Sequence, residues 1–365
     1  MVLFDGPLGE LVALKRGYDL PAPARRPGSI PVVSSRGIID SHDVARVRGP
    51  GVVTGRTGTL GEVIYVEEDF WPLNTTLYVR DFKGNDPRFV GYLLETIDYR
   101  TLSDKAAVPG VSRDELHHLR VSCPPLRRQK ELARGLAPFD RKLDLLRRMD
   151  AVHARTAHAH FEALPRDRTA RVDRLCTAFA NGGTPARRRS EYWERGTIPW
   201  FRSGDLADGP LVHAERRITR RGLEESSCRL FAPGAVLLAL YAAPTVGRLG
   251  VLDAPAAANQ ACCALRARPE CGHWFVFHAL LSSRARLQGL AVGAVQQNIS
   301  QQVLRAFEVE VPRAAAARAF HERVAPLHAL RAAHAREARG LRALRDALIR
   351  DLLLNEGRSS RTGTR

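Results

Sequence analysis

The stretch NISQQVLRAFEVEVP, residues 298–312, decides the fold because a similar stretch, VSRDELHHLRVSCPP, already occurs at residues 111–125. Placing Ser300 on Ser112 fixes an offset of 300 − 112 = 188 residues. The same offset, without a gap, aligns further residues of the same kind: Leu304 with Leu116, Phe307 with Leu119, Val309 with Val121 and Pro312 with Pro124. The two stretches are interpreted as copies of one unit.

Two further pairs of similar motifs lie upstream and occur in the same order in both halves. GSIPVVSSRGI at residues 28–38 is answered by GTIPWFRSGDL at residues 196–206, an offset of 196 − 28 = 168. GRTGTLGEVIYVEEDFWPLN at residues 55–74 has a fainter counterpart in APTVGRLGVLDAPAAAN, with Gly247 near Gly61 and Asn259 near Asn74. Because the offset changes only where loops could have grown or shrunk, the sequence predicts an internal duplication.

Length and composition set the frame for this duplication. A chain of 365 residues is long enough for two domains with their own cores. Its 44% hydrophobic and 26% charged residues are typical of a soluble globular protein. The N-terminus has no apolar core of signal-peptide length, and no run of 18 apolar residues occurs. We therefore expect a cytoplasmic protein with no membrane partner.

The net charge of +17 favours an acidic partner, and nucleic acid is the most common such partner for a soluble protein. A basic surface that serves only solubility is the alternative. Six cysteines are too few for a disulfide scaffold. The one cluster, Cys262, Cys263, Cys271 and His273, lacks the paired C-x2-C spacing of structural zinc sites, so we expect buried thiols and no metal.

The chain reads as two α+β domains, each followed by a long helix. Short apolar runs separated by Gly, Pro and Asp predict strands and turns in residues 1–124 and again in residues 165–312. Residues 125–164 and 313–356 predict helices, and residues 357–365 predict a disordered tail. The first helix carries a coiled-coil seam of Leu132, Leu136, Phe139, Leu143 and Leu146. The second carries Phe320, Val324, Leu327, Leu330, Leu341, Leu344, Leu348 and Leu352.

Each helix has only one apolar face, so each needs a partner, and the other helix is the nearest candidate. If the two halves are related by a pseudo-two-fold axis, the helices pack antiparallel. Arg331 and His334 interrupt the apolar face of the second helix, which predicts locally weaker pairing.

Motifs of a catalytic site are scarce in this sequence. GPGVVTGRT at residues 49–57 resembles a phosphate-binding loop, but it has Arg56 where lysine is required. The sequence contains neither N-P-P-Y nor D-P-P-Y, which argues against an amino-methyltransferase site, and it shows no nuclease arrangement. The histidines between His153 and His160 lie on a predicted helix, where packing or solvation is the more ordinary role than metal binding.

Polar residues at turns remain as candidates for contacts with DNA. Arg, Asn and Gln can pair with guanine or adenine edges in the major groove, and Ser or Thr can reach either base. Each of these residues could instead simply hold its turn. The candidates are Arg36, Arg56, Thr57, Asn74, Thr75, Arg202, Ser203, Asn259, Gln260, Gln296, Gln297 and Asn298.

The duplicated motifs resemble a known family. GRTGTLGEVIYVEEDFWPLNTTLYV, GTIPWFRSGDL and VQQNISQQVLRAFEVEVP, with a long helix after each domain, are similar to the specificity subunit of Type I restriction-modification systems. The resemblance implies an α+β fold with two pseudo-repeated α/β target recognition domains, joined by two long antiparallel coiled-coil helices. The second domain departs from the pattern, because LYAAPTVGRLG lacks the Gly-Arg-Thr-Gly spacing, and a matched DNA contact by Arg248 is therefore in doubt.

The resemblance also implies partners. In that family each recognition domain reads one half of a split target in double-stranded DNA, and the helices dock two methyltransferase subunits. Restriction and translocase subunits complete the complex, and S-adenosylmethionine, ATP and magnesium belong to the partners. Two alternatives from other classes remain: a self-contained DNA methyltransferase with an undetected active site, and a non-catalytic scaffold.

Overall fold

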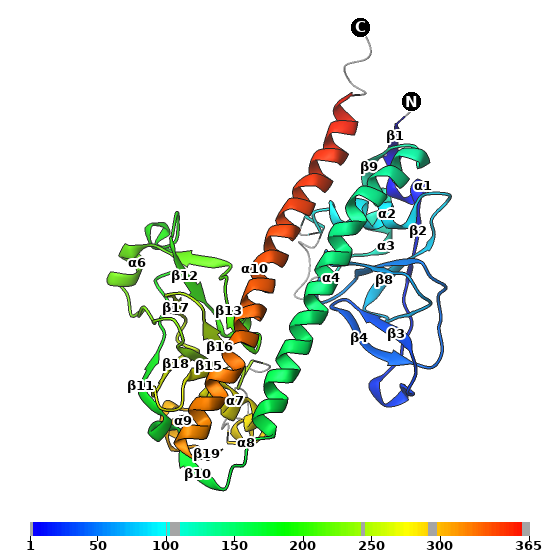
Figure 1. The fold of residues 1–365 in the computed structure, drawn as a ribbon. Helices are drawn as coiled ribbons and strands as arrows, with labels where there is room; N and C mark the ends of the chain where they lie inside the picture. Colours follow the sequence, from blue (N-terminus) through cyan, green and yellow to red (C-terminus); the bar gives the residue numbers. More distant parts are fainter. Residues whose placement is uncertain (1–2, 100, 103–109, 242–244, 291–297, 360–365) are drawn as a thin grey trace. The chain divides into compact units, whose positions relative to one another are not determined.

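The computed structural model describes residues 3–99, 101–102, 110–241, 245–290 and 298–359, with side chains placed as far as residue 351. The chain forms two compact units (Figure 1). Unit 1 contains residues 1–142 and 341–365, and unit 2 contains residues 143–340. Each unit therefore holds one α+β domain together with a part of each long helix.

The domain of unit 1 consists of two small sheets, a two-stranded ribbon and short helices. The four-stranded sheet has the order β2-β8-β5-β6, the three-stranded sheet has the order β4-β3-β7, and β1 pairs with β9. The strands are β1 (Phe4–Pro7), β2 (Ala13–Arg16), β3 (Ile30–Ser34), β4 (Gly37–His42), β5 (Gly51–Gly55), β6 (Val63–Val66), β7 (Trp71–Pro72), β8 (Thr76–Asp81) and β9 (Arg120–Cys123). The helices are α1 (Leu8–Leu11), η1 (Ala22–Ala24), α2 (Pro87–Glu95) and α3 (Arg113–His118).

The domain of unit 2 repeats this plan with one additional sheet strand. Its sheets have the orders β11-β18-β15-β16-β13 and β14-β12-β17, and β10 pairs with β19. The strands are β10 (Arg168–Arg171), β11 (Cys176–Asn181), β12 (Ile198–Phe201), β13 (Gly209–Leu211), β14 (Arg216–Ile218), β15 (Val236–Ala239), β16 (Leu249–Leu252), β17 (Ala257–Ala258), β18 (Cys262–Ala267) and β19 (Glu308–Val311). The helices are α5 (Val172–Leu175), η2 (Ser190–Tyr192), η3 (Ser203–Asp205), α6 (Arg220–Glu224), α7 (His273–Ser282), α8 (Arg284–Gly289) and α9 (Gln301–Ala306).

The strand registers confirm the duplication residue by residue. In unit 1, Val32 of β3 pairs in parallel with Trp71 of β7; in unit 2, Trp200 of β12 pairs in parallel with Ala257 of β17. The first members of these pairs differ by 200 − 32 = 168 residues, the offset that the sequence echoes predict. The second members differ by 257 − 71 = 186, and the same offset carries β6 onto β16 and β8 onto β18.

The opening pair of stretches forms the same structure twice. The Ser112 hydroxyl accepts a hydrogen bond from the backbone N–H of Glu115 at 3.1 Å and caps α3. The Ser300 hydroxyl accepts one from the backbone N–H of Val303 at 3.1 Å and caps α9. A serine at this position satisfies an amide that the helix itself leaves unpaired. Each capped helix then leads into the strand that closes its domain, β9 or β19.

The two long helices are α4 (Leu126–Glu162) and α10 (Ala314–Ser359). Most of the predicted packing residues lie inward: Leu132, Leu136, Leu146, Phe320 and Val324 are buried, and Phe139, Leu143, Leu327, Leu341 and Leu348 are partly buried. Leu330 and Leu344 are exposed, so their assignment to the apolar face is wrong. Helix α10 also includes residues 357–359 of the predicted tail. The side chain of Leu352 and residues 360–365 lie outside the part of the chain that the structure describes.

Within unit 2 the two helices run antiparallel. The centroids of the His153 and His334 rings lie 5.3 Å apart, and those of the Phe161 and Phe320 rings lie 5.6 Å apart. Residue numbers therefore increase along α4 in the direction in which they decrease along α10. Arg331, which interrupts the apolar pattern, is buried and donates from Nε to Asp150 Oδ1 at 2.9 Å. The interruption is therefore a polar layer with its own partners.

The cysteines lie in the cores of their domains as free thiols. Cys262 and Cys263 are consecutive residues of β18, and their side chains enter different core clusters because successive strand residues point to opposite faces. No helix in the described part of the chain is long and apolar enough to cross a bilayer.

Candidate nucleic-acid interface

Three turns of unit 1 bring most of its candidate residues together. The backbone N–H groups of Arg56 and Thr57, which follow β5, donate to the carbonyl oxygen of Thr75 at 2.9 and 3.2 Å. The β3–β4 turn carries Arg36 and lies beside the same loop, because a Cβ built on Gly55 would meet Cβ of Ser35 at 3.2 Å. Arg36, Arg56, Thr57 and Thr75 therefore share one end of the domain.

The loop after β5 requires glycine. A Cβ added at Gly55 would lie 1.9 Å from the carbonyl oxygen of Thr59, closer than any real contact. Gly58 has a φ of +85°, a conformation that residues with a side chain rarely adopt. The Gly-Arg-Thr-Gly spacing seen in the sequence thus holds a tight loop that presents Arg56 and Thr57.

The candidate side chains of unit 1 differ in how free they are. Arg36 is exposed, and no ion pair joins it to another residue that the structure describes. Thr75 has a buried hydroxyl without a hydrogen-bond partner in the described residues. Asn74 donates from Nδ2 to the Asp19 carboxylate, which is a turn-holding role.

The candidates of unit 2 are more strongly engaged within the protein. Arg202 donates to Asp205 at 2.8 Å and to Glu215 at 2.7 Å, and these carboxylates raise its pKa. Ser203 begins η3, which is closed by the same Arg202–Asp205 contacts. Gln260 accepts a hydrogen bond from the hydroxyl of Thr184. Arg202 and Gln260 therefore hold the local structure.

Asn259 and Asn298 occupy backbone-pairing positions. The backbone N–H of Asn259 donates to the carbonyl oxygen of Phe201 at 2.8 Å, and that of Leu73 donates to the carbonyl oxygen of Val33 in the same way. The structural counterpart of Asn259 is therefore Leu73, and that of Asn74 is Gln260. Asn298 is exposed and forms an isolated antiparallel β-bridge with Tyr241. Gln296 and Gln297 lie outside the described residues.

The two units differ where unit 1 carries its polar loop. The backbone N–H of Leu240 donates to the carbonyl oxygen of Ala261 at 2.7 Å, and this hydrogen bond corresponds to the one from Arg56 to Thr75 in unit 1. The 186-residue offset aligns Arg248 with Glu62, so Arg248 is not the counterpart of Arg56. Leu240 is fully buried, and the scaffold of unit 2 therefore presents no arginine at this position.

An arginine-lined pocket of unit 2 was missed at the sequence level. Arg187, Arg216 and Arg217 line it together with Trp193 and Glu215, and its volume is about 360 Å³. Arg187 and Arg216 are exposed, whereas Glu215 is already paired with Arg202. The runs ARRRS at residues 186–190 and ERR at residues 215–217 were the available signal. They lie far apart in the sequence, and only the fold brings them together.

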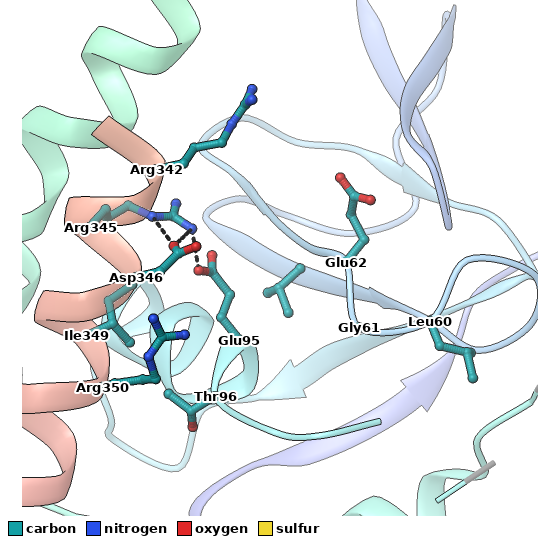
Figure 2. Close-up of a pocket in the computed structure, with 11 residues that line it drawn as sticks. Leu60, Gly61, Glu62, Glu95, Thr96, Arg342, Arg345, Asp346, Ile349 and Arg350 are labelled. Carbon is teal, nitrogen blue, oxygen red and sulfur yellow. Dashed lines mark hydrogen bonds and ion pairs between the residues drawn. The ribbon is translucent and has the colours of Figure 1, made fainter. Parts of the chain in front are cut away.

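Unit 1 also contains a polar cavity of about 570 Å³ beside α10. Figure 2 shows Arg345 and Asp346 of α10 pointing toward Glu95 of α2. Arg345 donates to Glu95 at 2.5 Å and to Asp140 at 2.7 Å. Burial raises the pKa of Glu95 to about 7, although Arg345 opposes the shift. These charges neutralise one another, so the cluster is best suited to holding α10 against α2 and α4.

A chain of two buried histidines and the half-buried His158 joins three helices of unit 2. Arg331 Nη1 lies 3.5 Å from His328 Nδ1, His328 Nε2 lies 3.0 Å from His278 Nε2, and His278 Nδ1 lies 3.3 Å from His158 Nδ1. A guanidinium only donates, so each histidine in turn accepts at one nitrogen and donates from the other. Burial lowers the pKa of His278 to about 3 and that of His328 to about 2, in keeping with neutral rings.

Comparison with known proteins assigns the chain to a family. The model of the Type I restriction modification DNA specificity domain matches twice, at residues 5–151 and 169–321. The chain belongs to this family. The two matches coincide with the two copies of the fold, which accounts for the duplicated registers.

Relatives and a solved structure agree with membership of the specificity domain family. The Type I restriction enzyme MjaIX specificity subunit of Methanocaldococcus jannaschii is 32% identical over 27% of this chain and 22% of its own length. The EcoprrI specificity subunit of Escherichia coli is 34% identical over 24% of this chain and 21% of its own length. The matched segments thus span about a fifth of these relatives. The structure of the S subunit of a Type I restriction-modification system from M. genitalium aligns over 97% of this chain and 96% of its own chain, with 15% identity. The TM-score of 0.56 shows that the two share a fold.

Proposed function

We propose that this chain is the DNA-recognition subunit of a Type I restriction-modification complex and reads a bipartite target, with one half-site per domain. The observation that carries the proposal is the repeated fold, in which each copy matches the specificity domain model. The net charge of +17 supports binding to the phosphate backbone. The chain contributes no catalytic residue in this proposal.

The two domains read DNA in different ways. In unit 1, exposed Arg36 and half-buried Arg56 and Thr57 lie on adjacent turns, where arginine can pair with guanine and threonine with either base type. In unit 2, Arg187 and Arg216 neutralise phosphates, which positions the domain without reading sequence. The unequal polar surfaces support a target whose two halves are different sequences.

The long helices dock two methyltransferase subunits and fix the spacer between the half-sites. Leu145, Met149 and Val152 support docking, because they lie four and three residues apart on α4 and are 49%, 36% and 48% exposed. Residues at this spacing share one helix face. A contiguous apolar stripe of this kind is typical of a surface that a partner covers.

The partners supply the chemistry of the complex. Methyltransferase subunits bind S-adenosylmethionine, and restriction subunits use ATP and magnesium to translocate and cut DNA. This chain determines where those activities are directed.

Co-expression with a candidate methyltransferase subunit tests the proposal, followed by mapping of methylated adenines across a genome by single-molecule sequencing. The expected result is a single bipartite motif with a fixed gap, which disappears when this chain is omitted. Methylation by this chain without a partner would instead indicate a self-contained methyltransferase. A stable complex that methylates no site would count against recognition.

A further inference from the structure

Two isoleucines are exposed side by side on the β3–β4 hairpin of unit 1. Ile38 is 55% exposed and Ile39 is 48% exposed, and both follow the turn that carries Arg36. Single exposed apolar side chains are common on soluble proteins, whereas contiguous ones can mark an interaction site. The hairpin lies at the end of the domain that also presents Arg56 and Thr57.

A β-bulge directs both side chains outward. Val32 pairs with Asp40 and Val33 pairs with Ile38, so Ile39 is an extra residue in β4. In a regular strand consecutive side chains point to opposite faces, and one of the two would be buried. An inserted residue changes this alternation, and such bulges re-aim side chains near functional sites.

The charges around the hairpin suit a polyanion. Asp40 and Asp43 accept from Arg25 at 2.9 Å and from Arg26 at 2.7 Å, so neither carboxylate presents an unpaired negative charge. Arg36, at the turn itself, has no ion pair among the described residues. The hairpin therefore combines an apolar surface with a free cation.

The isoleucines belong to unit 1 alone. The pairs Val32–Asp40 and Trp200–Arg216 occupy the same position in the two sheets. From Val32 to Asp40, unit 1 has the short turn and the isoleucines. From Trp200 to Arg216, unit 2 has a longer segment that forms η3 and β13. A feature confined to one copy suits the reading of one half-site.

We propose that Ile38 and Ile39 read thymine in the half-site of unit 1 by packing against its C5-methyl group in the major groove. This inference rests on the proposed function. The major groove admits a two-stranded β-ribbon, and the thymine methyl is the apolar group that it exposes. Arg36 would hold an adjacent phosphate or guanine while the isoleucines contact the methyl.

The test uses the full chain assembled with its methyltransferase subunits and duplexes that carry the mapped target. Thymines are replaced one at a time by deoxyuridine, which removes only the methyl group, and binding is measured by fluorescence anisotropy. One or two replacements in the unit 1 half-site should weaken binding about fourfold each, the value of one buried methyl group. The variants Ile38→Ala and Ile39→Ala should bind thymine and deoxyuridine duplexes equally well.

Leu230→Ala is the matched control, because Leu230 is 52% exposed but lies in unit 2. It should retain the sensitivity to deoxyuridine. The inference is overturned if the unit 1 half-site contains no thymine, or if wild type and the isoleucine variants respond equally to deoxyuridine. It is also overturned if the variants instead abolish self-association in sedimentation, which would identify a second copy as the partner. Loss of all sequence preference in the wild-type complex would instead reject the proposed function.

Discussion

At the scale of single residues, the stability of unit 2 depends strongly on Arg331. Its side chain is 7% exposed, and it donates to Asp150, to the Asp208 carbonyl and toward His328. A buried cation of this kind is tolerated only with such partners, because desolvation penalises an unpaired charge. Arg331 therefore links α4, α10 and the start of the histidine chain.

Replacement of Arg331 should therefore destabilise unit 2. Arg331→Ala leaves Asp150 and His328 without their donor, and we expect a loss of about 3 kcal/mol in the free energy of unfolding, measured in urea. Arg336→Ala is the matched control, since Arg336 is 54% exposed and its pair with Asp253 should be worth less than about 1 kcal/mol. Equal losses in the two variants would show that the buried position has no special role.

Gly55 offers a second test at this scale. Gly55→Ala would place a Cβ 1.9 Å from the Thr59 carbonyl oxygen, so the loop that presents Arg56 must move. We expect methylation of the mapped target to fall at least tenfold. Gly135→Ala is the control, because no atom lies near its added Cβ and alanine favours a helix by up to about 1 kcal/mol. Unchanged methylation by Gly55→Ala would show that the loop makes no contact with DNA.

At the scale of elements, the sequence predicted the repeat and the absence of the Gly-Arg-Thr-Gly loop from the second copy, but it missed other local differences between the copies. The 188-residue offset was visible because α3 with β9 and α9 with β19 have the same spacing and the same serine caps. The change of offset from 168 to 188 revealed a difference in loop length, but not that it lies partly between β12 and β14, because a loop has no periodicity that marks where a strand such as β13 forms. The arginine pocket was missed for a related reason, since Arg187 and Arg216 meet only through folding.

The histidine chain, together with the half-buried His273 at the start of α7, predicts a response of unit 2 to acid. The pKa values of His273, His278 and His328 in the folded state are lowered to about 4, 3 and 2, chiefly by burial, below the ordinary value of 6.5. The unfolded state therefore binds more protons below pH 6.5, and stability should be full above that pH and fall as the pH decreases toward 4. Each histidine contributes about 1.4 kcal/mol per pH unit in that window.

Urea unfolding between pH 7 and pH 4.5 measures this effect. His278→Phe removes one titrating ring and should reduce the slope of stability against pH. His118→Phe is the control, because His118 is exposed on α3 of unit 1. An unchanged slope in His278→Phe would contradict the assignment of acid sensitivity to this chain.

The arginine pocket makes a prediction about salt. Arg187→Ala with Arg216→Ala should weaken binding of all DNA sequences to a similar extent and reduce the slope of log affinity against log salt by about 1 to 2. Arg220→Ala with Arg221→Ala is the control, because these residues pair with Glu224 and Glu225 on the same domain. A change in the preferred bases without a change in slope would show that the pocket reads sequence.

At the scale of the whole molecule, the duplication predicts modular specificity. Exchanging residues 1–123 for another domain of this family should change one half of the methylated motif and leave the other half intact. Inserting residues into α4 near Ala151 should change the gap and neither half. Both outcomes are read from the genome-wide map of methylated adenines. A change in both halves after the domain exchange would contradict one domain per half-site.

The paired entry and exit strands have an evolutionary consequence. Phe4 lies opposite Cys123 in the β1–β9 ribbon, and Arg168 lies opposite Val311 in the β10–β19 ribbon, so each domain begins and ends at one place. Recombination at those two points exchanges a whole domain as a cassette without altering the helices between them. Under the proposed function, a population that shares a modest pool of cassettes for each slot commands as many targets as there are combinations.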